Sequence, residues 1–217
     1  MHKGNSVLEL DVREELGWDP VLDDSRITVT ANNGRVTLSG AVPTYYQMVL
    51  AGEDAWSVGG VSSVDNELLV GPLGDSVADA AIAEDAAAAL DANSLVPEGA
   101  VSVEVTNGWV TLRGNVEYYY QRQEAEDVVS RVDGVRGITD EVLISSDATA
   151  ADVAASINRA FRRNAIIDES KIQVSVSGHT VFLDGTVDSW DAMGAATDTA
   201  WSAPGVTDVV NRLVLVP

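Results

Sequence analysis

Apolar and polar residues alternate in short stretches that recur three times along the chain. The period of two residues is typical of β-strands that bury one face. Three such stretches occur in each copy: ITVTA from Ile27, VSVEV from Val101 and IQVSV from Ile172; then 32–42, 106–116 and 176–187; then 64–70, 138–144 and 209–215. The pattern predicts three strands in each of three similar segments.

A glycine-containing turn separates the first two strands of every copy. Asn33-Gly34, Asn107-Gly108 and Ser177-Gly178 supply residues that tolerate positive φ, which predicts a β-hairpin. The third copy has one residue more, His179-Thr180 where the first has Arg35 alone, so we expect a longer turn or a bulge there.

Spaced small residues predict a helix between the second and third strands. Ala51, Ala125 and Ala196 are followed four positions later by Ala55, Val129 and Ala200. That spacing places both members of a pair on one helix face, close to the sheet. Another helix precedes the hairpin, with expected N-caps at Ser6-x-x-Glu9, Ser76-x-x-Asp79 and Thr149-x-x-Asp152. The predicted order is helix, strand, strand, helix, strand.

Constant spacing supports a tandem repeat. The second glycine of each central segment lies 20 residues before a Gly-Val pair in all three copies, from Gly40 to Gly60, Gly114 to Gly134 and Gly185 to Gly205. We therefore predict three modules, at residues 1–71, 75–145 and 148–217. The repeated glycines, which are Gly34, Gly40, Gly60, Gly108, Gly114, Gly134, Gly178, Gly185 and Gly205, are interpreted as structural turn and close-packing positions.

The repeated unit resembles the BON domain. Residues 33–42, 107–116 and 178–187 carry the motif N-G-x-V-T-L-x-G-x-V, and Asn66 and Asn211 carry a later asparagine where the second copy has Asp140. The expected fold class is α+β, with three tandem modules that each have a three-stranded mixed sheet covered by two helices. The resemblance implies non-enzymatic association with phospholipid or envelope surfaces, often in osmotic stress, or potassium-ion binding in the cytoplasm.

Charge narrows the choice of partners. The formal net charge is −21, from 34 acidic and 13 basic residues, so the averaged field repels nucleic acid, and we expect no nucleic-acid partner. The acidity is typical of proteins adapted to high salt and equally of an ordinary acidic protein from a GC-rich genome. The first thirty residues lack the apolar stretch of a signal peptide, which predicts a cytoplasmic protein, or a periplasmic or extracellular one if the sequence was trimmed or another export route is used.

Catalytic and cofactor motifs are lacking in the sequence. There is no cysteine, the two histidines are His2 and His179, and neither of the common glycine-rich nucleotide motifs occurs. We therefore expect a non-enzyme without cofactor or metal, and interpret acidic pairs such as Asp23-Asp24 as solvated surface.

One basic cluster and one aromatic run are candidates for binding. The third segment is the least acidic and holds Arg159, Arg162 and Arg163 on one helix face, with Lys171 nearby. These cations either bind anionic headgroups or pair with Asp168 and Glu169. Aromatic residues open the second helix of each copy: Tyr45, Tyr119 and Trp190 are expected in the core, whereas Tyr118 or Tyr120 should remain exposed for a partner.

Two hypotheses for function follow. The first is an adaptor that binds phospholipid or envelope components through the third module. The second is a structural protomer that assembles into a homopolymer or filament through its modules, because small sheets expose edge strands and head-to-tail contacts need not close.

Overall fold

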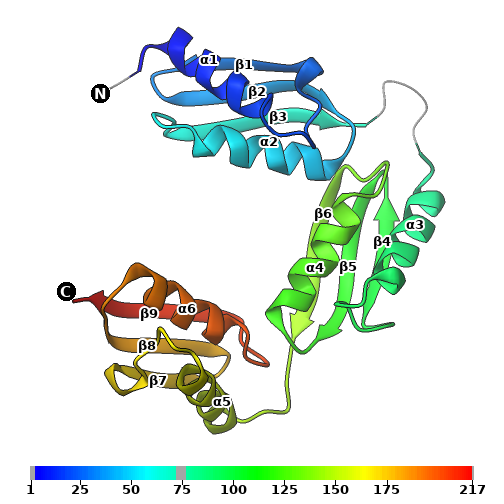
Figure 1. Ribbon diagram of the computed structural model, residues 1–217. Helices are drawn as coiled ribbons and strands as arrows, with labels where there is room; N and C mark the ends of the chain where they lie inside the picture. The colour runs from blue at the N-terminus through cyan, green and yellow to red at the C-terminus, as the bar shows by residue number, and fades with distance from the viewer. Residues whose placement is uncertain (1–2, 72–76, 217) are drawn as a thin grey trace. The chain divides into compact units, whose positions relative to one another are not determined.

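A computed structural model describes residues 3–71 and 77–216 (Figure 1). Three repeats follow one another, each in the order helix, strand, strand, helix, strand. The first contains α1 (Asn5–Leu16), β1 (Ile27–Asn32), β2 (Arg35–Val42), α2 (Tyr45–Ser57) and β3 (Ser63–Val70). The second contains α3 (Asp79–Ala92), β4 (Val101–Thr106), β5 (Trp109–Val116), α4 (Tyr119–Ser130) and β6 (Gly137–Ile144). The third contains α5 (Ala150–Arg163), β7 (Ile172–Ser177), β8 (Thr180–Val187), α6 (Trp190–Trp201) and β9 (Asp208–Leu215).

Each repeat has its own three-stranded mixed sheet, in the orders β1-β2-β3, β4-β5-β6 and β7-β8-β9. In the first repeat β1 pairs antiparallel with β2, and β3 adds parallel to β2 on the other side. The third repeat has the same pairing. The parallel partner is reached by a crossover through the second helix, as a parallel connection requires. The predicted α+β class is confirmed.

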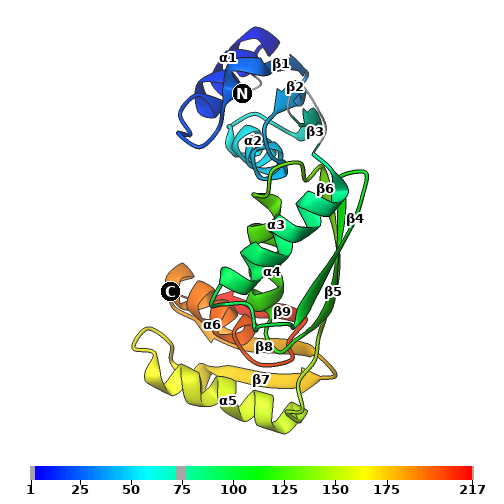
Figure 2. The same cartoon turned by 90° about the vertical axis from the view of Figure 1, so that its right-hand side faces the viewer.

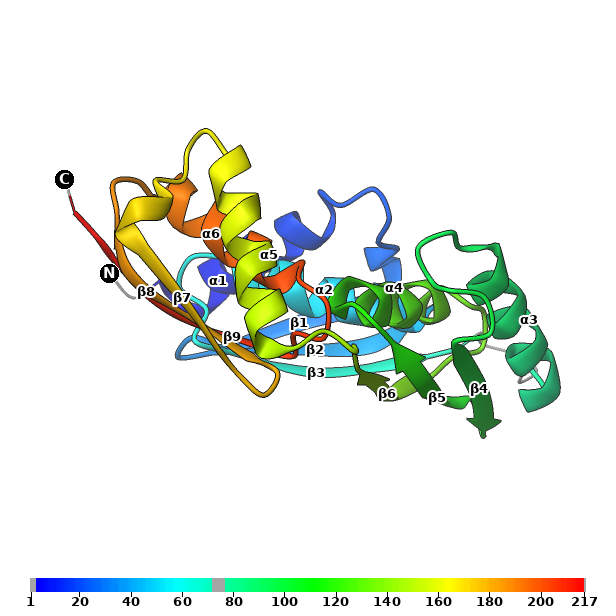
Figure 3. The same ribbon diagram turned by 90° about the horizontal axis from the view of Figure 1, so that it is seen from below.

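Both helices of a repeat cover the same face of its sheet, as Figure 3 shows for α5 and α6 over β7–β9. Figure 2 shows α5 running alongside β7. The core lies between the two layers, and the alternation seen in the sequence places Val36, Leu38 and Val42 of β2 in it. Ala51, Ala55, Ala125, Val129, Ala196 and Ala200 are all fully buried, so the helix face predicted from their spacing is confirmed.

The third hairpin is no longer than the first, which corrects one prediction. Ser177 pairs with Thr180 as Asn32 pairs with Arg35, so both loops have two residues and there is no bulge at this end of the hairpin. Gly178 occupies the first loop position, the place of Asn33 in the first repeat. There, Asn33 and Gly34 both have positive φ, as in a type I′ turn, whereas Gly178 alone does in the third, as in a type II′ turn.

Gly40, Gly114 and Gly185 are not turn residues, because they lie inside β2, β5 and β8. Each has a positive φ of 123° to 152°. A Cβ at these positions would lie 2.0, 1.9 and 2.0 Å from the carbonyl oxygens of Arg26, Ala100 and Lys171. Glycine is required because the chain leading into the neighbouring strand passes directly over the backbone. Gly60, Gly134 and Gly205 do lie in turns, before the third strands.

The N-cap predictions have three different outcomes. Thr149 caps α5 through a reciprocal capping box with Asp152, as predicted. Ser6 lies within α1, whose N-cap is Gly4, so that prediction is wrong. Ser76 lies outside the described residues, and α3 has Ala78 as its N-cap.

The chain divides into two compact units, and the boundary between them runs through the second repeat. One unit comprises Met1–Asn93, Ser102–Leu112 and Glu126–Asp140; the other comprises Ser94–Val101, Arg113–Ala125 and Glu141–Pro217. The first and third repeats thus each lie whole within one unit.

Candidate binding surfaces

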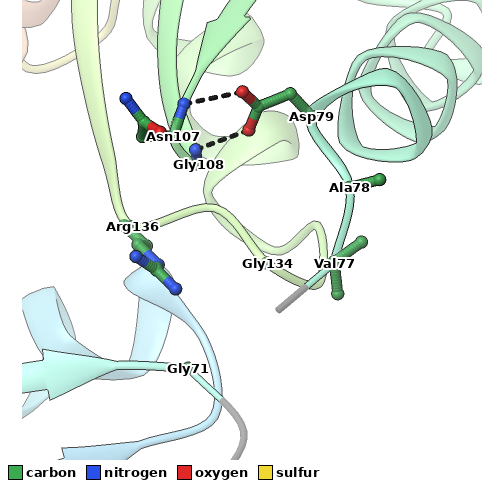
Figure 4. A pocket seen from close by; sticks show the side chains of 8 residues that line it. All are labelled: Gly71, Val77, Ala78, Asp79, Asn107, Gly108, Gly134 and Arg136. Carbon is green, nitrogen blue, oxygen red and sulfur yellow. Dashed lines mark hydrogen bonds between the residues drawn. The ribbon is translucent and has the colours of Figure 1, made fainter. Parts of the chain in front are cut away.

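The hollow drawn in Figure 4 is held together by Asp79, the first residue of α3. Its carboxylate accepts hydrogen bonds from the backbone N–H groups of Asn107 and Gly108 at 2.7 and 2.8 Å. The hollow has a volume of about 320 Å³, and Val77, Gly134 and Arg136 also line it. Both carboxylate oxygens of Asp79 are already bonded to the turn. Asp79 therefore connects α3 to the hairpin, and its carboxylate is not free to bind a ligand.

The four cations predicted to form a site in the third repeat do not all remain available. Arg162 donates to Glu169 at 2.6 Å, and Lys171 lies 3.3 Å from Asp168. Glu169 and Lys171 belong to a short 3-10 turn, Glu169–Lys171, that folds back beside the end of α5. Two of the cations therefore pair with the two carboxylates named as the alternative.

Arg159 and Arg163 differ from these two. Both are exposed, and neither forms an ion pair in the described part of the chain, although the pKa of Asp152, lowered chiefly by hydrogen bonds from Thr149, is lowered further by the charge of Arg159. Val153, Ile157 and Phe161 form the buried face of α5. The helical period of 3.6 residues puts Arg159 and Arg163 on the opposite face, one turn apart. The first repeat has Glu14 and Trp18 at these two positions, and the second has Ala88 and Ala92.

An exposed aliphatic residue accompanies this pair. Ile166 is 51% exposed, and the next residue, Ile167, is buried. The same arrangement occurs at Val21-Leu22 and Leu95-Val96 of the other repeats. In the third repeat Ile166 follows Arg163 by three residues, just beyond the end of α5, so the loop after this helix adds an exposed aliphatic side chain close in sequence to the cations. Sequence periodicity missed Ile166 because the loop that exposes it is irregular.

The aromatic residues at the helix starts have divided outcomes. Tyr120 is 44% exposed and stacks on Tyr118 with ring centroids 5.5 Å apart, in agreement with an exposed ring at this place. Tyr45 and Tyr119 are partly buried. Trp190 is 71% exposed, so its prediction as a core residue is wrong. It is the first residue of α6, directly after the N-cap Ser189, whereas the buried residues of this helix are Ala192, Ala196 and Ala200.

A shallow apolar hollow of about 390 Å³ lies along α2 and β3 in the first repeat. It is lined by Val49, Gly52, Glu53, Trp56, Val64 and Asn66. Trp56 is 58% exposed even though it lies at the C-terminal end of a packed helix. A Cβ at Gly52 would lie 3.1 Å from Nδ2 of Asn66, which donates to the carbonyl of Met48 at 2.7 Å, so glycine makes room for the asparagine at this place.

Asp54, on the same helix, carries an unusual carboxylate. Its Oδ2 atom is buried and has no hydrogen-bond partner among the described residues. Burial, together with repulsion from Asp19, Glu15 and Glu53, raises the pKa of Asp54 to about 6. The third repeat has Thr199 at this position, whose hydroxyl donates to the carbonyl of Ala195 at 2.7 Å.

Neither a metal-binding cluster nor a membrane span occurs within residues 3–71 and 77–216. In that part of the chain, no group of three or more His, Cys, Asp or Glu side chains is placed to hold a metal ion. None of the helices described there has the length and apolarity needed to cross a bilayer.

Three small α+β modules in tandem define a repeat protein built from one kind of domain. The family model described as BON domain matches residues 5–72, 78–146 and 149–217, and the chain belongs to the BON domain family. Osmotically-inducible protein Y of Escherichia coli (strain K12) is 35% identical over 143 residues, which are 64% of this chain and 71% of that protein.

Two solved structures of CdsD, a structural protein of the type III secretion system of Chlamydia trachomatis, are also similar. One has 16% identity and a TM-score of 0.29, and covers 97% of this chain and 93% of its own. The other, a C-terminal domain, has 17% identity and a TM-score of 0.28, with 99% and 100% covered.

Proposed function

We propose that the protein is a non-catalytic adaptor of the osmotic-stress type whose third repeat binds anionic phospholipid surfaces. The observation that carries the proposal is the unpaired, exposed pair Arg159 and Arg163 on the outer face of α5. Guanidinium groups that form no direct ion pair keep their donors available for phosphate oxygens. The similarity to osmotically-inducible protein Y supports the osmotic context.

Local charge has to overcome the repulsion of the whole molecule. At ~0.1 M salt the Debye length is about 10 Å, so distant carboxylates are largely screened while a group in contact with the surface is not. The third segment has 9 acidic and 5 basic residues, against 14 and 4 in the second, which favours it as the part that approaches the membrane. Ile166 adds an aliphatic side chain that can enter the headgroup layer.

Sedimentation with phosphatidylglycerol vesicles at ~0.1 M salt tests the proposal. Each arginine near an anionic surface contributes roughly 1 kcal/mol, so reversal of both to Glu should weaken binding at least about 30-fold. The matched control is Arg113→Glu with Arg122→Glu, which changes the net charge equally in the second repeat and should leave much of the binding intact.

Two results would contradict this function. One is a wild-type protein that stays in the supernatant with phosphatidylglycerol vesicles. The other is equal loss of binding in the control variant, because then net charge and not the face of α5 would govern association. Phosphatidylcholine vesicles should bind little in every case, since they lack net negative charge.

A further inference from the structure

Contacts between consecutive repeats recur at corresponding places within the two units. In one unit, the ring of Tyr119 at the start of α4 packs against Trp201 at the end of α6, with centroids 4.5 Å apart. In the other, the guanidinium of Arg131, directly after α4, lies 3.9 Å from the ring centroid of Tyr46 at the start of α2. In both contacts, an aromatic residue at the start of the second helix of one repeat packs against the end of the second helix of the next repeat, which is α2 with α4 and α4 with α6.

Within the described residues, the start of α6 and the end of α2 do not take part in a contact of this kind. Trp190 corresponds to Tyr45 and Tyr119, and Trp56 corresponds to Trp201. Both tryptophans are more than half exposed, and the side of Trp56 opens on the hollow between α2 and β3. Large exposed indoles of this kind are typical of protein interfaces.

We propose that Trp190 of one copy docks in the α2–β3 hollow beside Trp56 of a second copy, so that the chains associate head to tail. A second copy is the partner that fits, because the chain already packs Tyr119 on Trp201 at the corresponding pair of positions. The backbone supports the same alignment. Gly205 N–H donates to the carbonyl of Glu117 at 2.8 Å. Asp188, just before α6, and Gly60, just after α2, occupy the corresponding positions.

The contact joins different surfaces of the two copies, so it can continue from copy to copy and does not require a closed ring. It uses residues other than Arg159 and Arg163 and does not rest on lipid binding. Salt separates the two activities: ~0.5 M NaCl screens the repulsion between acidic copies and favours indole burial, but weakens binding to charged headgroups.

Sedimentation velocity of the full chain in ~0.5 M NaCl, without lipid, is the test. The average mass of the wild type should rise with protein concentration. Trp56→Ala retains Trp190 but damages the hollow that receives it, and Trp190→Ala retains the hollow but lacks the docking side chain. Each variant alone should therefore remain a monomer. An equimolar mixture should form dimers and nothing larger, because one functional contact is left. Trp18→Ala, which removes an indole that is 85% exposed in the first repeat, should associate like the wild type.

Several results would overturn the proposal. These are a wild type that stays monomeric at all concentrations, a single variant that still polymerises, or a mixture that forms no dimer. Docking of Trp190 on Trp56 within one chain would also overturn it, and would appear as a change of tryptophan fluorescence independent of concentration. Circular dichroism checks the fold of each variant, and Trp56→Gln and Trp190→Gln, which retain more of the side chain, replace any alanine variant that fails it.

Discussion

The first helices of the second and third repeats begin in different ways. Asp79 at the start of α3 directs its carboxylate away from its own helix and binds two amides of the hairpin turn. At the start of α5 that position is Ala150, and the preceding residue, Thr149, caps the helix locally with Asp152. The first repeat resembles the second, since Asn5 accepts one hydrogen bond from the N–H of Asn33.

The turns differ together with the helix starts. Asn107 and Gly108 both have positive φ, and their N–H groups converge on one carboxylate. In the third repeat the turn is attached elsewhere, because His179 Nδ1 lies 2.8 Å from the carbonyl oxygen of Gly205, before β9. In the second repeat the residue at the helix start holds the hairpin turn, whereas in the third repeat the helix start is capped within its own helix. The turn of the third repeat is held by His179 and the carbonyl of Gly205 instead.

The glycines inside the central strands are where the repeats should not differ. Gly114→Ala and Gly185→Ala each bring a Cβ to within 2.0 Å of a backbone carbonyl oxygen. We expect each substitution to lower the free energy of unfolding by more than about 3 kcal/mol. The amides of the substituted repeat should also lose their protection from hydrogen exchange. Urea unfolding monitored by hydrogen exchange and mass spectrometry measures both.

Gly194→Ala is the control for this pair. It lies within α6, where an added Cβ meets no atom within 4 Å, so alanine should stabilise the helix by about 0.5–1 kcal/mol. If Gly185→Ala were as mild as Gly194→Ala, the close approach of the Lys171 carbonyl would not be a property of the folded protein.

Asp54 is the sharpest chemical difference between the first and third repeats. Its pKa is raised from 3.8 to about 6, so the folded state favours the protonated acid, and this carboxyl destabilises the first repeat increasingly as pH rises from about 4 to about 6. Asp54→Thr, which copies Thr199, should stabilise the protein by about 1–2 kcal/mol at pH 7.5, after allowance for solvent screening. The gain should vanish near pH 4; a gain independent of pH would show that ionisation is not its cause.

Strand pattern and alanine spacing were enough to predict the repeat, its element order and the buried helix face, because these depend on local periodicity. Features that depend on distant atoms were not predictable in the same way. The requirement for glycine at Gly40 comes from the carbonyl of Arg26, far across the hairpin. The availability of Arg163 and the pairing of Arg162 depend on where Glu169 folds back.

Two errors came from alignment. Matching Gly178 with Gly34 by residue type implied an extra residue, whereas strand register matches Gly178 with Asn33. Matching Trp190 with Tyr45 implied a buried ring. Corresponding residues on corresponding helices can nevertheless differ in burial, because the segments that pack over them differ. Residue identity is therefore a weaker guide than register where a turn or a helix start changes type.

The two helix starts can be compared directly by truncation. Asp79→Ala removes two hydrogen bonds to backbone amides and should cost about 1–2 kcal/mol, with faster exchange of the amides of Asn107 and Gly108. Thr149→Ala removes a capping box and should cost about 1 kcal/mol, with faster exchange confined to the first turn of α5. Faster exchange at the Gly178-His179 turn in Thr149→Ala would contradict the separation between a local cap and a helix–turn tie.

The smallest expected effect tests whether the tie can be transplanted into the third repeat. Ala150→Asp alone adds a carboxylate at a helix N-terminus and should stabilise by only about 0.3 kcal/mol, because the type II′ turn does not present both amides to it. Gly178→Asn with His179→Gly recreates the sequence of a type I′ turn but loses the His179 anchor, so alone it should be neutral or slightly destabilising. The triple variant should regain the two amide bonds and exceed the sum of its parts by about 1 kcal/mol in a double-mutant cycle. Strict additivity would mean that the turn type does not control the hydrogen bonds between the helix-start carboxylate and the turn amides. The difference between the repeats would then lie in the helix cap alone.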